Sequence, residues 1–214
     1  MMVHVTKLTH SCVLVEADGK TALFDPGGYS VKDGMIRPES MPKLDYVVYT
    51  HSHGDHFNAN FLKDLLWIQQ PMVIGPKDIK EVLEKEGVQA NWRQENKDVV
   101  MVAAPHEKLP WPDMVTPEHA AYHFMDMFTH AGDSHTLEES KAVLAIALVG
   151  PWANTGEMVS KTLELSPKFM IPIHDWHLSK EGRDYYDSRL AAVFANHKTQ
   201  PVRVLDAQSV SLEV

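Results

Sequence analysis

The stretch Thr50-His51-Ser52-His53-Gly54-Asp55-His56 decides the fold of this chain. Three histidines and one aspartate lie within residues 51–56, directly after the apolar segment 45–49, which we predict to be a buried strand. A strand sends alternate side chains to opposite faces, so this crowding requires a loop beyond the strand end, where Gly54 permits the turn. Packing gives no reason for such spacing, so the sequence predicts a metal site. Imidazole nitrogen and carboxylate oxygen suit zinc first, with manganese and iron as alternatives.

The pattern His-x-His-x-Asp-His after a strand resembles the signature of the metallo-β-lactamase-fold hydrolases. Further segments match that family in order along the chain: Asp25 at the end of the strand-like run 21–25, Pro105-His106 after 99–104, Gly132-Asp133 within 129–134, and His174 after 169–173. The resemblance implies an α/β (α+β) fold, the four-layer αβ/βα sandwich, with metals at the loop edge between two sheets. The segments 10–16 and 170–174 further resemble the branch that contains L-ascorbate-6-phosphate lactonase.

The resemblance also implies a set of metal ligands for two divalent ions. One ion would be held by His51, His53 and His106, the other by Asp55, His56 and His174, and Asp133 would bridge them. His119 and His123 are alternatives for the third ligand of the first ion. We prefer His106 because its Pro-His context after a buried strand matches the family.

The expected function is a dinuclear metal-dependent hydrolase that uses a metal-bridging hydroxide on a small lactone, ester or phosphodiester. Two divalent ions about 3.5–4 Å apart lower the pKa of a shared water towards about 7 and polarise the oxygen of the group attacked. No Gly-x-Ser-x-Gly elbow or Gly-rich phosphate loop offers another nucleophile. The alternatives are a non-catalytic metal-stabilised binding protein and a mono-iron sulfur dioxygenase-like enzyme. Because redox di-iron relatives replace the second signature histidine with Glu, His53 disfavours oxygen chemistry.

Several other residues have two interpretations each. His10 either joins Asp55 and Asp133 in the catalytic machinery or is an exposed polar residue. Asp25 is expected to orient a ligand imidazole by accepting its free N–H. His135 is a candidate for contact with substrate, and the alternative is that it has no part in the site. Four further histidines are expected to be structural or to lie on the surface: His4, His130, His177 and His197. Trp111 and Trp176 are expected to be either walls of a pocket or part of the core.

Composition favours one compact domain spanning residues 1–214, since 44% of the chain is apolar. The single cysteine, Cys12, excludes an intrachain disulfide and is expected to be a small buried apolar residue. No apolar run reaches the ~20 residues of a membrane span, and no basic and hydrophobic leader is visible, so we expect a cytoplasmic protein. The chain has 29 acidic and 20 Lys and Arg residues. Because the Lys and Arg are scattered, a small-molecule substrate is favoured over nucleic acid, and a homo-oligomer stays open.

Periodicity predicts alternating strands and helices. We expect strands over 3–8, 11–16, 20–25, 45–50, 99–104, 121–130, 142–149, 168–173, 202–206 and 209–213, and helices over 58–68, 76–86, 155–165 and 179–197. The segment 105–119 is too rich in proline for a helix or central strand. It is either a loop that faces substrate or an ordinary surface connection.

Overall fold

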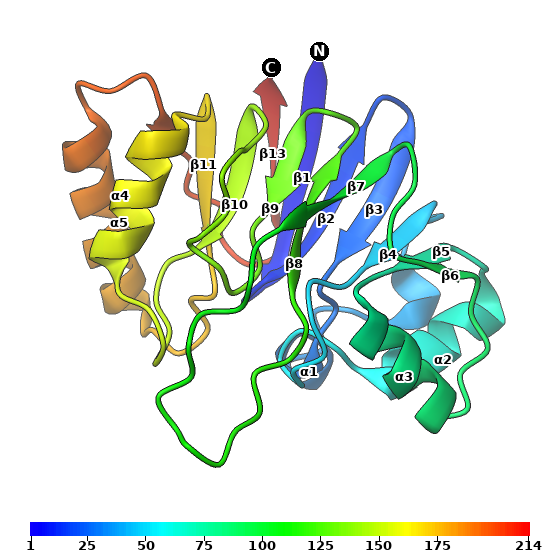
Figure 1. Ribbon diagram of the computed structural model, residues 1–214. Helices are drawn as coiled ribbons and strands as arrows, with labels where there is room; N and C mark the ends of the chain where they lie inside the picture. The colour runs from blue at the N-terminus through cyan, green and yellow to red at the C-terminus, as the bar shows by residue number, and fades with distance from the viewer.

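The computed structural model describes residues 1–214 and contains two mixed β-sheets (Figure 1). The first sheet has seven strands in the order β13-β1-β2-β3-β4-β5-β6. Strands β13 to β3 are antiparallel, and β3 to β6 are parallel. Their bounds are β1 Met2–Thr9, β2 Cys12–Ala17, β3 Lys20–Phe24, β4 Tyr46–Val48, β5 Met72–Ile74, β6 Trp92–Arg93 and β13 Gln208–Glu213.

The second sheet has six strands in the order β12-β11-β10-β9-β8-β7. Strands β7, β8 and β9 pair antiparallel, and β9 to β12 pair parallel. Their bounds are β7 Val99–Ala103, β8 Ala120–Phe124, β9 Phe128–His130, β10 Val143–Ala147, β11 Phe169–Ile173 and β12 Gln200–Pro201. In each sheet, the strands that end near the candidate ligands run in one direction, so their carboxyl ends meet at one edge of the molecule.

Helices cover the outer face of each sheet. In Figure 1, α2 (Ala59–Ile68) and α3 (Lys77–Lys85) lie beside β4 to β6, and α4 (Thr155–Leu165) and α5 (Lys180–Phe194) lie outside β10 and β11. Two short elements, α1 (Gly28–Lys32) and the 3-10 helix η1 (Pro38–Ser40), follow β3. None of these helices combines the length and apolar character that a membrane crossing requires.

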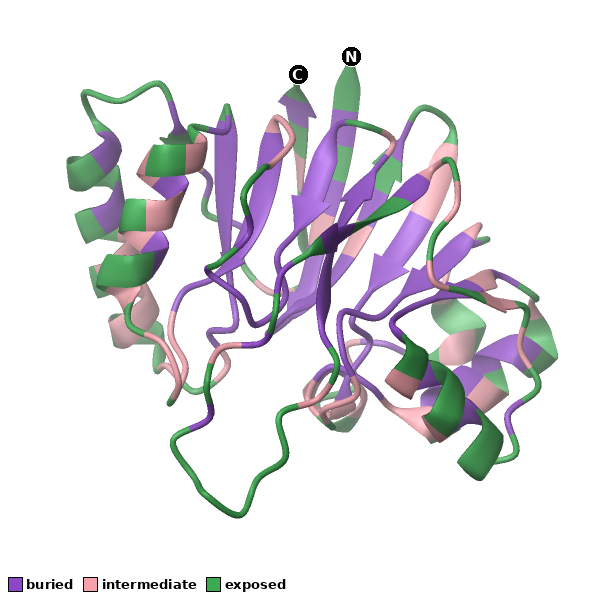
Figure 2. Ribbon diagram, in the orientation of Figure 1, coloured by how far each residue is buried: buried purple, intermediate pink, exposed green.

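Three apolar cores separate the four layers. The strands carry apolar side chains on both faces: in β10, Val143 and Ala145 pack in the core between the sheets, whereas Leu144 and Ile146 pack in the core that includes Leu190 of α5. A third core joins the first sheet to α2 and α3. Figure 2 shows the central strands buried along nearly their whole length. The four-layer αβ/βα sandwich expected from the sequence is confirmed.

Four sequence expectations differ from the structure. The expected strand 121–130 is two antiparallel strands, β8 and β9, which reverse at Met125 and Asp126, both with positive φ. The expected strand 202–206 is a loop, preceded by the short strand β12. The expected helix 179–197 ends at Phe194. The elements β5, β6, α1 and η1 were not expected.

Candidate metal centre

Six strand ends from the two sheets deliver the candidate ligands to one place. The loops after β1, β3 and β4 of the first sheet meet the loops after β7, β9 and β11 of the second. Backbone hydrogen bonds join these loops directly: the N–H of Gly28 donates to Gly54 O, that of Glu107 to Asp133 O, and that of His174 to His10 O. Both sheets are therefore needed to assemble the site.

The turn that carries Asp55 depends on a close approach by Gly27. A Cβ on Gly27 would lie 1.7 Å from the carbonyl oxygen of Asp55, so no other residue fits there without moving the backbone. The expectation that Gly54 permits this turn is wrong. Gly54 has no positive φ, and a Cβ there would meet no atom within 4 Å. The glycine that the turn requires belongs to the neighbouring loop, which the local sequence does not reveal.

Three residues of the site have left-handed backbone conformations. Asp25, His10 and His174 have φ values of 45°, 53° and 58°. Such values are uncommon for residues other than glycine and cost on the order of 1 kcal/mol each. They turn the chain sharply at the ends of β1, β3 and β11, and the packing of the two sheets maintains them.

The first ligand group consists of His51, His53, His106 and Asp133, which offer atoms within 4.8 Å of one another. His51 Nε2 lies 3.1 Å from His53 Nδ1 and 3.8 Å from Asp133 Oδ2. His106 Nε2 lies 3.6 Å from the same carboxylate oxygen. Three imidazoles and one carboxylate at these separations can surround one divalent ion.

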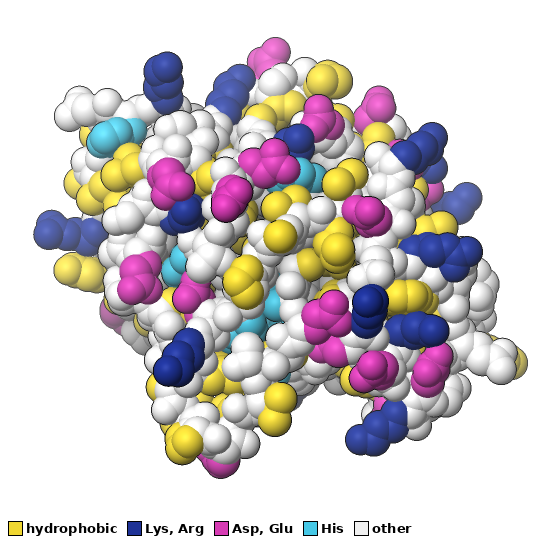
Figure 3. Space-filling model, in the orientation of Figure 1, with side chains coloured by type: hydrophobic (Ala, Val, Ile, Leu, Met, Phe, Trp, Pro, Cys, Tyr) yellow, Lys and Arg dark blue, Asp and Glu magenta, His cyan; other side chains and the backbone are white.

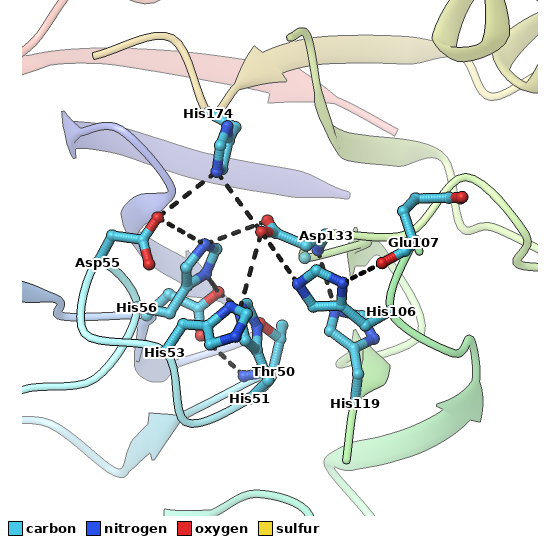
Figure 4. A network of polar contacts seen from close by, with 12 residues as sticks. Thr50, His51, His53, Asp55, His56, His106, Glu107, His119, Asp133 and His174 are labelled. Atoms are coloured by element: carbon cyan, nitrogen blue, oxygen red, sulfur yellow. Dashed lines mark hydrogen bonds and ion pairs between the residues drawn. The ribbon is translucent and has the colours of Figure 1, made fainter. Parts of the chain in front are cut away.

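The second ligand group consists of His10, Asp55, His56 and His174. Asp55 Oδ2 lies 3.2 Å from His10 Nε2, 3.6 Å from His174 Nε2 and 3.8 Å from His56 Nε2. Asp133 also faces this group, since its Oδ1 is 3.1 Å from His56 Nε2 and its Oδ2 is 3.5 Å from His174 Nε2 (Figure 4). The structure thus places all seven expected ligands together, with Asp133 between the two groups, and places His10 beside Asp55.

The second nitrogen of most of these imidazoles is held by a protein acceptor. His56 Nδ1 donates to Asp25 Oδ2 at 2.8 Å, His174 Nδ1 to Val149 O at 2.7 Å, and His106 Nδ1 to Glu107 O. Such contacts fix the tautomer and leave the Nε2 lone pair free for a cation. Asp25 thus contacts the imidazole of a candidate ligand.

Asp25 supports a second histidine through Thr50. The backbone N–H and the hydroxyl of Thr50 donate to Asp25 at 2.8 and 2.7 Å, and the hydroxyl oxygen is 3.0 Å from His51 Nδ1. Burial opposes the charge on Asp25, but His56, His130 and these donors lower its pKa below the ordinary value. One buried carboxylate therefore orients a histidine from each group.

The charges within the site also suit cations. Burial and neighbouring imidazoles lower the pKa of His51 well below its ordinary value, which leaves a neutral ring. Burial would lower the pKa of His56 as well, but Asp133, Asp55 and Asp25 raise it well above the ordinary value. Burial opposes the charge on Asp133, yet His174 and His56 hold its pKa well below the usual range. Protons and divalent ions therefore compete for the same donor atoms.

Several buried donor and acceptor atoms in the site make no well-formed hydrogen bond, although they lie within ion-pair distance of Asp133 or the imidazoles. These include Nε2 of His56, His106 and His174 and Oδ1 of Asp133, and all four point into the shared space. Buried polar atoms without well-formed hydrogen bonds cost free energy, which a purely structural cluster would not recover. Divalent ions would satisfy all of them, and the donor set therefore fits such ions.

The two alternative ligands of the first group lie elsewhere. His119 Nδ1 donates to Ala104 O, and its Nε2 accepts the backbone N–H of Asp133 at 2.9 Å. Burial lowers the pKa of His119 to about 4, which keeps Nε2 an acceptor. His123 contacts Thr129, outside both groups. Of the three candidates, the structure brings only His106 into the cluster, while His119 positions Asp133.

The remaining histidines lie in the pocket, in the interior or on the surface. His135 Nε2 donates to Ala147 O at 2.9 Å, and the residue does not line the pocket above the ligands. His130 is buried and accepts the N–H of Gly132. His177, expected to be structural or superficial, lines the pocket. His4 hydrogen-bonds to Ser211 and His197 is exposed, as expected for surface residues.

A pocket of about 830 Å³ opens above the ligand groups. The segment 105–119 has no regular structure, and three of its side chains line this pocket, so its position agrees with a loop that faces substrate. Trp111 belongs to the pocket wall rather than the core, whereas Trp176 stacks behind the wall on Tyr29. The apolar and aromatic lining residues are Tyr29, Leu109, Trp111, Met114, Val149, Pro151 and Trp152.

Comparisons with known proteins agree with this geometry. The family model described as the beta-lactamase superfamily domain matches residues 4–174. Protein Rv0786c of Mycobacterium tuberculosis is 26% identical over 203 residues, covering 87% of this chain and 90% of that protein. A metal-dependent hydrolase of Carboxydothermus hydrogenoformans is 33% identical over 90 residues, covering 41% of this chain and 37% of that protein.

A solved structure shares the fold over the full length. The metallo hydrolase Igni18 of the archaeon Ignicoccus hospitalis superposes with a TM-score of 0.67 at 18% identity, covering 100% of both chains. The family match extends over most of the chain and ends at His174, the last candidate ligand. The chain therefore belongs to the beta-lactamase superfamily and has the metallo-β-lactamase fold.

Proposed function

We propose that this protein is a dinuclear metal-dependent hydrolase, with zinc as the first candidate metal, and that it acts on a small lactone, ester or phosphodiester. The observation that carries the proposal is the position of Asp133. Its Oδ1 is 3.1 Å from His56 Nε2 of one ligand group, and its Oδ2 is 3.6 Å from His106 Nε2 of the other. Two divalent ions held by these residues would supply a water of lowered pKa as nucleophile and would polarise the oxygen of the group attacked.

Within this proposal, the side chains have distinct tasks. Asp133 bridges the two groups, and Asp25 and His119 hold ligands from behind. His10 is buried, and burial with the nearby His174 lowers its pKa to about 3, so the ring is neutral. Its Nε2–H donates to Asp55 Oδ2 at 3.2 Å and fixes how that carboxylate faces the cluster.

The arrangement also supports a single domain and a small substrate. Both sheets contribute ligands, and β13 pairs with β1, so neither half is complete without the other. On the face shown in Figure 3, Lys and Arg side chains are scattered rather than gathered into a track, which disfavours a polyanion. The resemblance of two segments to the L-ascorbate-6-phosphate lactonase branch makes lactones the first class to test.

The metal stoichiometry of reconstituted protein tests the proposal. We expect two divalent ions per chain by elemental analysis, loss of metal and activity in Asp133→Ala, and loss of one ion in His174→Ala. The exposed Asp126 pairs with Lys141 far from the site, so Asp126→Ala is the matched control. A stoichiometry of one that His174→Ala leaves unchanged would refute the dinuclear proposal.

Activity profiling separates the alternatives. Metal-loaded protein should hydrolyse at least one member of a panel of lactones, carboxylic esters and phosphodiesters, with ¹⁸O from labelled water entering the product in the first turnover. Two bound ions without turnover of any substrate class would favour a metal-stabilised binding protein. Oxygen consumption by an iron-loaded form with one ion per chain would favour a dioxygenase.

A further inference from the structure

The pocket above the ligand groups has an aromatic wall built on the turn after β10. The Trp152 ring centroid lies 5.0 Å from that of His174 and 5.6 Å from that of His106. One indole therefore spans both ligand groups. A Cβ on Gly150 would lie 2.7 Å from this indole, so glycine is what lets the ring fold back over its own turn. The backbone of this turn therefore fixes the position of the Trp152 ring.

A second wall faces the ligand group of Asp55. Tyr29 stacks on Trp176 with ring centroids 4.0 Å apart and planes 4° apart. The Trp176 indole N–H donates to Asp33 at 2.7 Å, which fixes the stack. The loop 105–119 covers the pocket with Leu109 and Met114. The space between these walls is thus bounded mainly by apolar and aromatic groups.

The charges that line the pocket are few. Asp55 and Asp133 belong to the ligand groups, and Lys32 is the single Lys or Arg among the lining residues. Its side chain is exposed, and Nζ lies 5.9 Å from the Trp176 ring centroid. Recognition of a phosphate usually requires several convergent donors such as Arg, Lys or a helix N-terminus. A phosphate group on the substrate would therefore have one exposed lysine as its Lys or Arg partner in this pocket.

We infer that the pocket binds a neutral ester or lactone that carries an apolar chain or ring, and that it discriminates against phosphorylated sugars. This inference rests on the proposed hydrolysis and names the substrate class for it. The volume of about 830 Å³ accommodates a group well beyond the scissile bond. Each methylene buried against these walls should increase affinity about three- to fourfold.

Binding of a non-hydrolysable analogue tests this recognition apart from catalysis. With the purified metal-loaded protein, 2-hexylcyclopentanone should bind at least about a hundredfold more tightly than cyclopentanone by calorimetry, given about 0.8 kcal/mol per buried methylene. Trp111→Ser should weaken this preference about tenfold, on the order expected for an aromatic contact surface. Trp67 is 91% exposed on α2 and away from the pocket, so Trp67→Ser is the matched control and should keep the wild-type preference.

Turnover gives the second test. The kcat/KM for γ-decalactone should exceed that for 6-phosphogluconolactone by at least about a hundredfold. Preference for the phosphorylated lactone, or equal effects of Trp111→Ser and Trp67→Ser on ketone binding, would overturn the inference. Tight ketone binding without turnover of any ester or lactone would support apolar recognition while refuting the proposed hydrolysis.

Discussion

Replacement of Asp25 by Asn should damage the metal centre without removing a ligand. Oδ1 of Asp25 accepts the backbone N–H of Thr50, and an amide oxygen can keep that bond. Oδ2 accepts both the Thr50 hydroxyl and His56 Nδ1–H, and in the variant an NH₂ group takes its place. The hydroxyl can rotate to accept a hydrogen bond, but His56 Nδ1–H then faces another donor.

The cost follows from the loss of that charged hydrogen bond. A hydrogen bond to a charged group contributes about 1.5–3 kcal/mol, so we expect Asp25→Asn to lower the free energy of unfolding by about 2–3 kcal/mol. His56 can relieve the clash by moving its proton to Nε2, the atom that faces Asp133. That tautomer competes with a metal ion, so affinity for the ion bound by His56 should fall about 10- to 100-fold.

Competition with a chelating dye measures the affinity, and urea unfolding measures the stability. Asp45→Asn is the matched control, because Asp45 also accepts a threonine N–H and one further donor, Lys20, at the half-exposed start of β4. Asp45→Asn should lower the free energy of unfolding by less than about 1 kcal/mol and leave the metal affinity unchanged. Unchanged affinity in Asp25→Asn, or an equal fall in Asp45→Asn, would refute the argument.

Four further substitutions separate ligands from structural residues. His106→Ala should lower metal content and activity together, whereas His123→Ala should lower only the free energy of unfolding. Elemental analysis measures the metal content and urea unfolding the stability. A larger loss of metal in His123→Ala than in His106→Ala would reassign the ligand to His123. Burial raises the pKa of the Cys12 thiol, so Cys12→Ser should keep its metal and most of its activity in a steady-state assay, and complete inactivation would contradict a water nucleophile. Lys7 Nζ lies 2.5 Å from the carboxylate of the buried Asp175. Lys7→Met should therefore lower the free energy of unfolding, measured in urea, by about 3 kcal/mol. A decrease of less than about 1 kcal/mol would indicate that the pair is solvated.

The sequence predicts most of the fold because its periodicities reflect burial directly. Phe61, Leu62 and Leu65 recur at helical spacing, and all three are buried against the first sheet. The reversal between β8 and β9 was missed because Met125 and Asp126 include neither glycine, asparagine nor proline, although both have positive φ. Very short strands such as β6, with two residues, carry no periodic signal and form only because a neighbouring strand supplies the pairing.

The candidate ligands were predictable because metal binding concentrates donor residues in short motifs after strands. Their supports were harder to predict. His119 is distant in sequence from most of the ligands, and its role arises only when the loop after β9 brings the N–H of Asp133 to its ring. Trp152 had a local signal, the Gly150-Pro151 pair after the expected strand 142–149, but nothing local showed that its indole would span two ligand groups.

The pairing of β1 with β13 has a consequence for synthesis of the protein on the ribosome. Strand β1 emerges before β2 and can form a hairpin with it at once, but its other edge stays unpaired until residues 208–213 are synthesised. Until then it presents unpaired N–H and C=O groups to other chains, the kind of edge that seeds aggregation in nascent proteins. In the folded protein, Thr6 and His4 of this strand hydrogen-bond to the hydroxyls of Ser209 and Ser211. The edge that β13 later pairs with therefore carries polar side chains. Slow translation of the last segment should therefore increase misfolding more than equal slowing near β5.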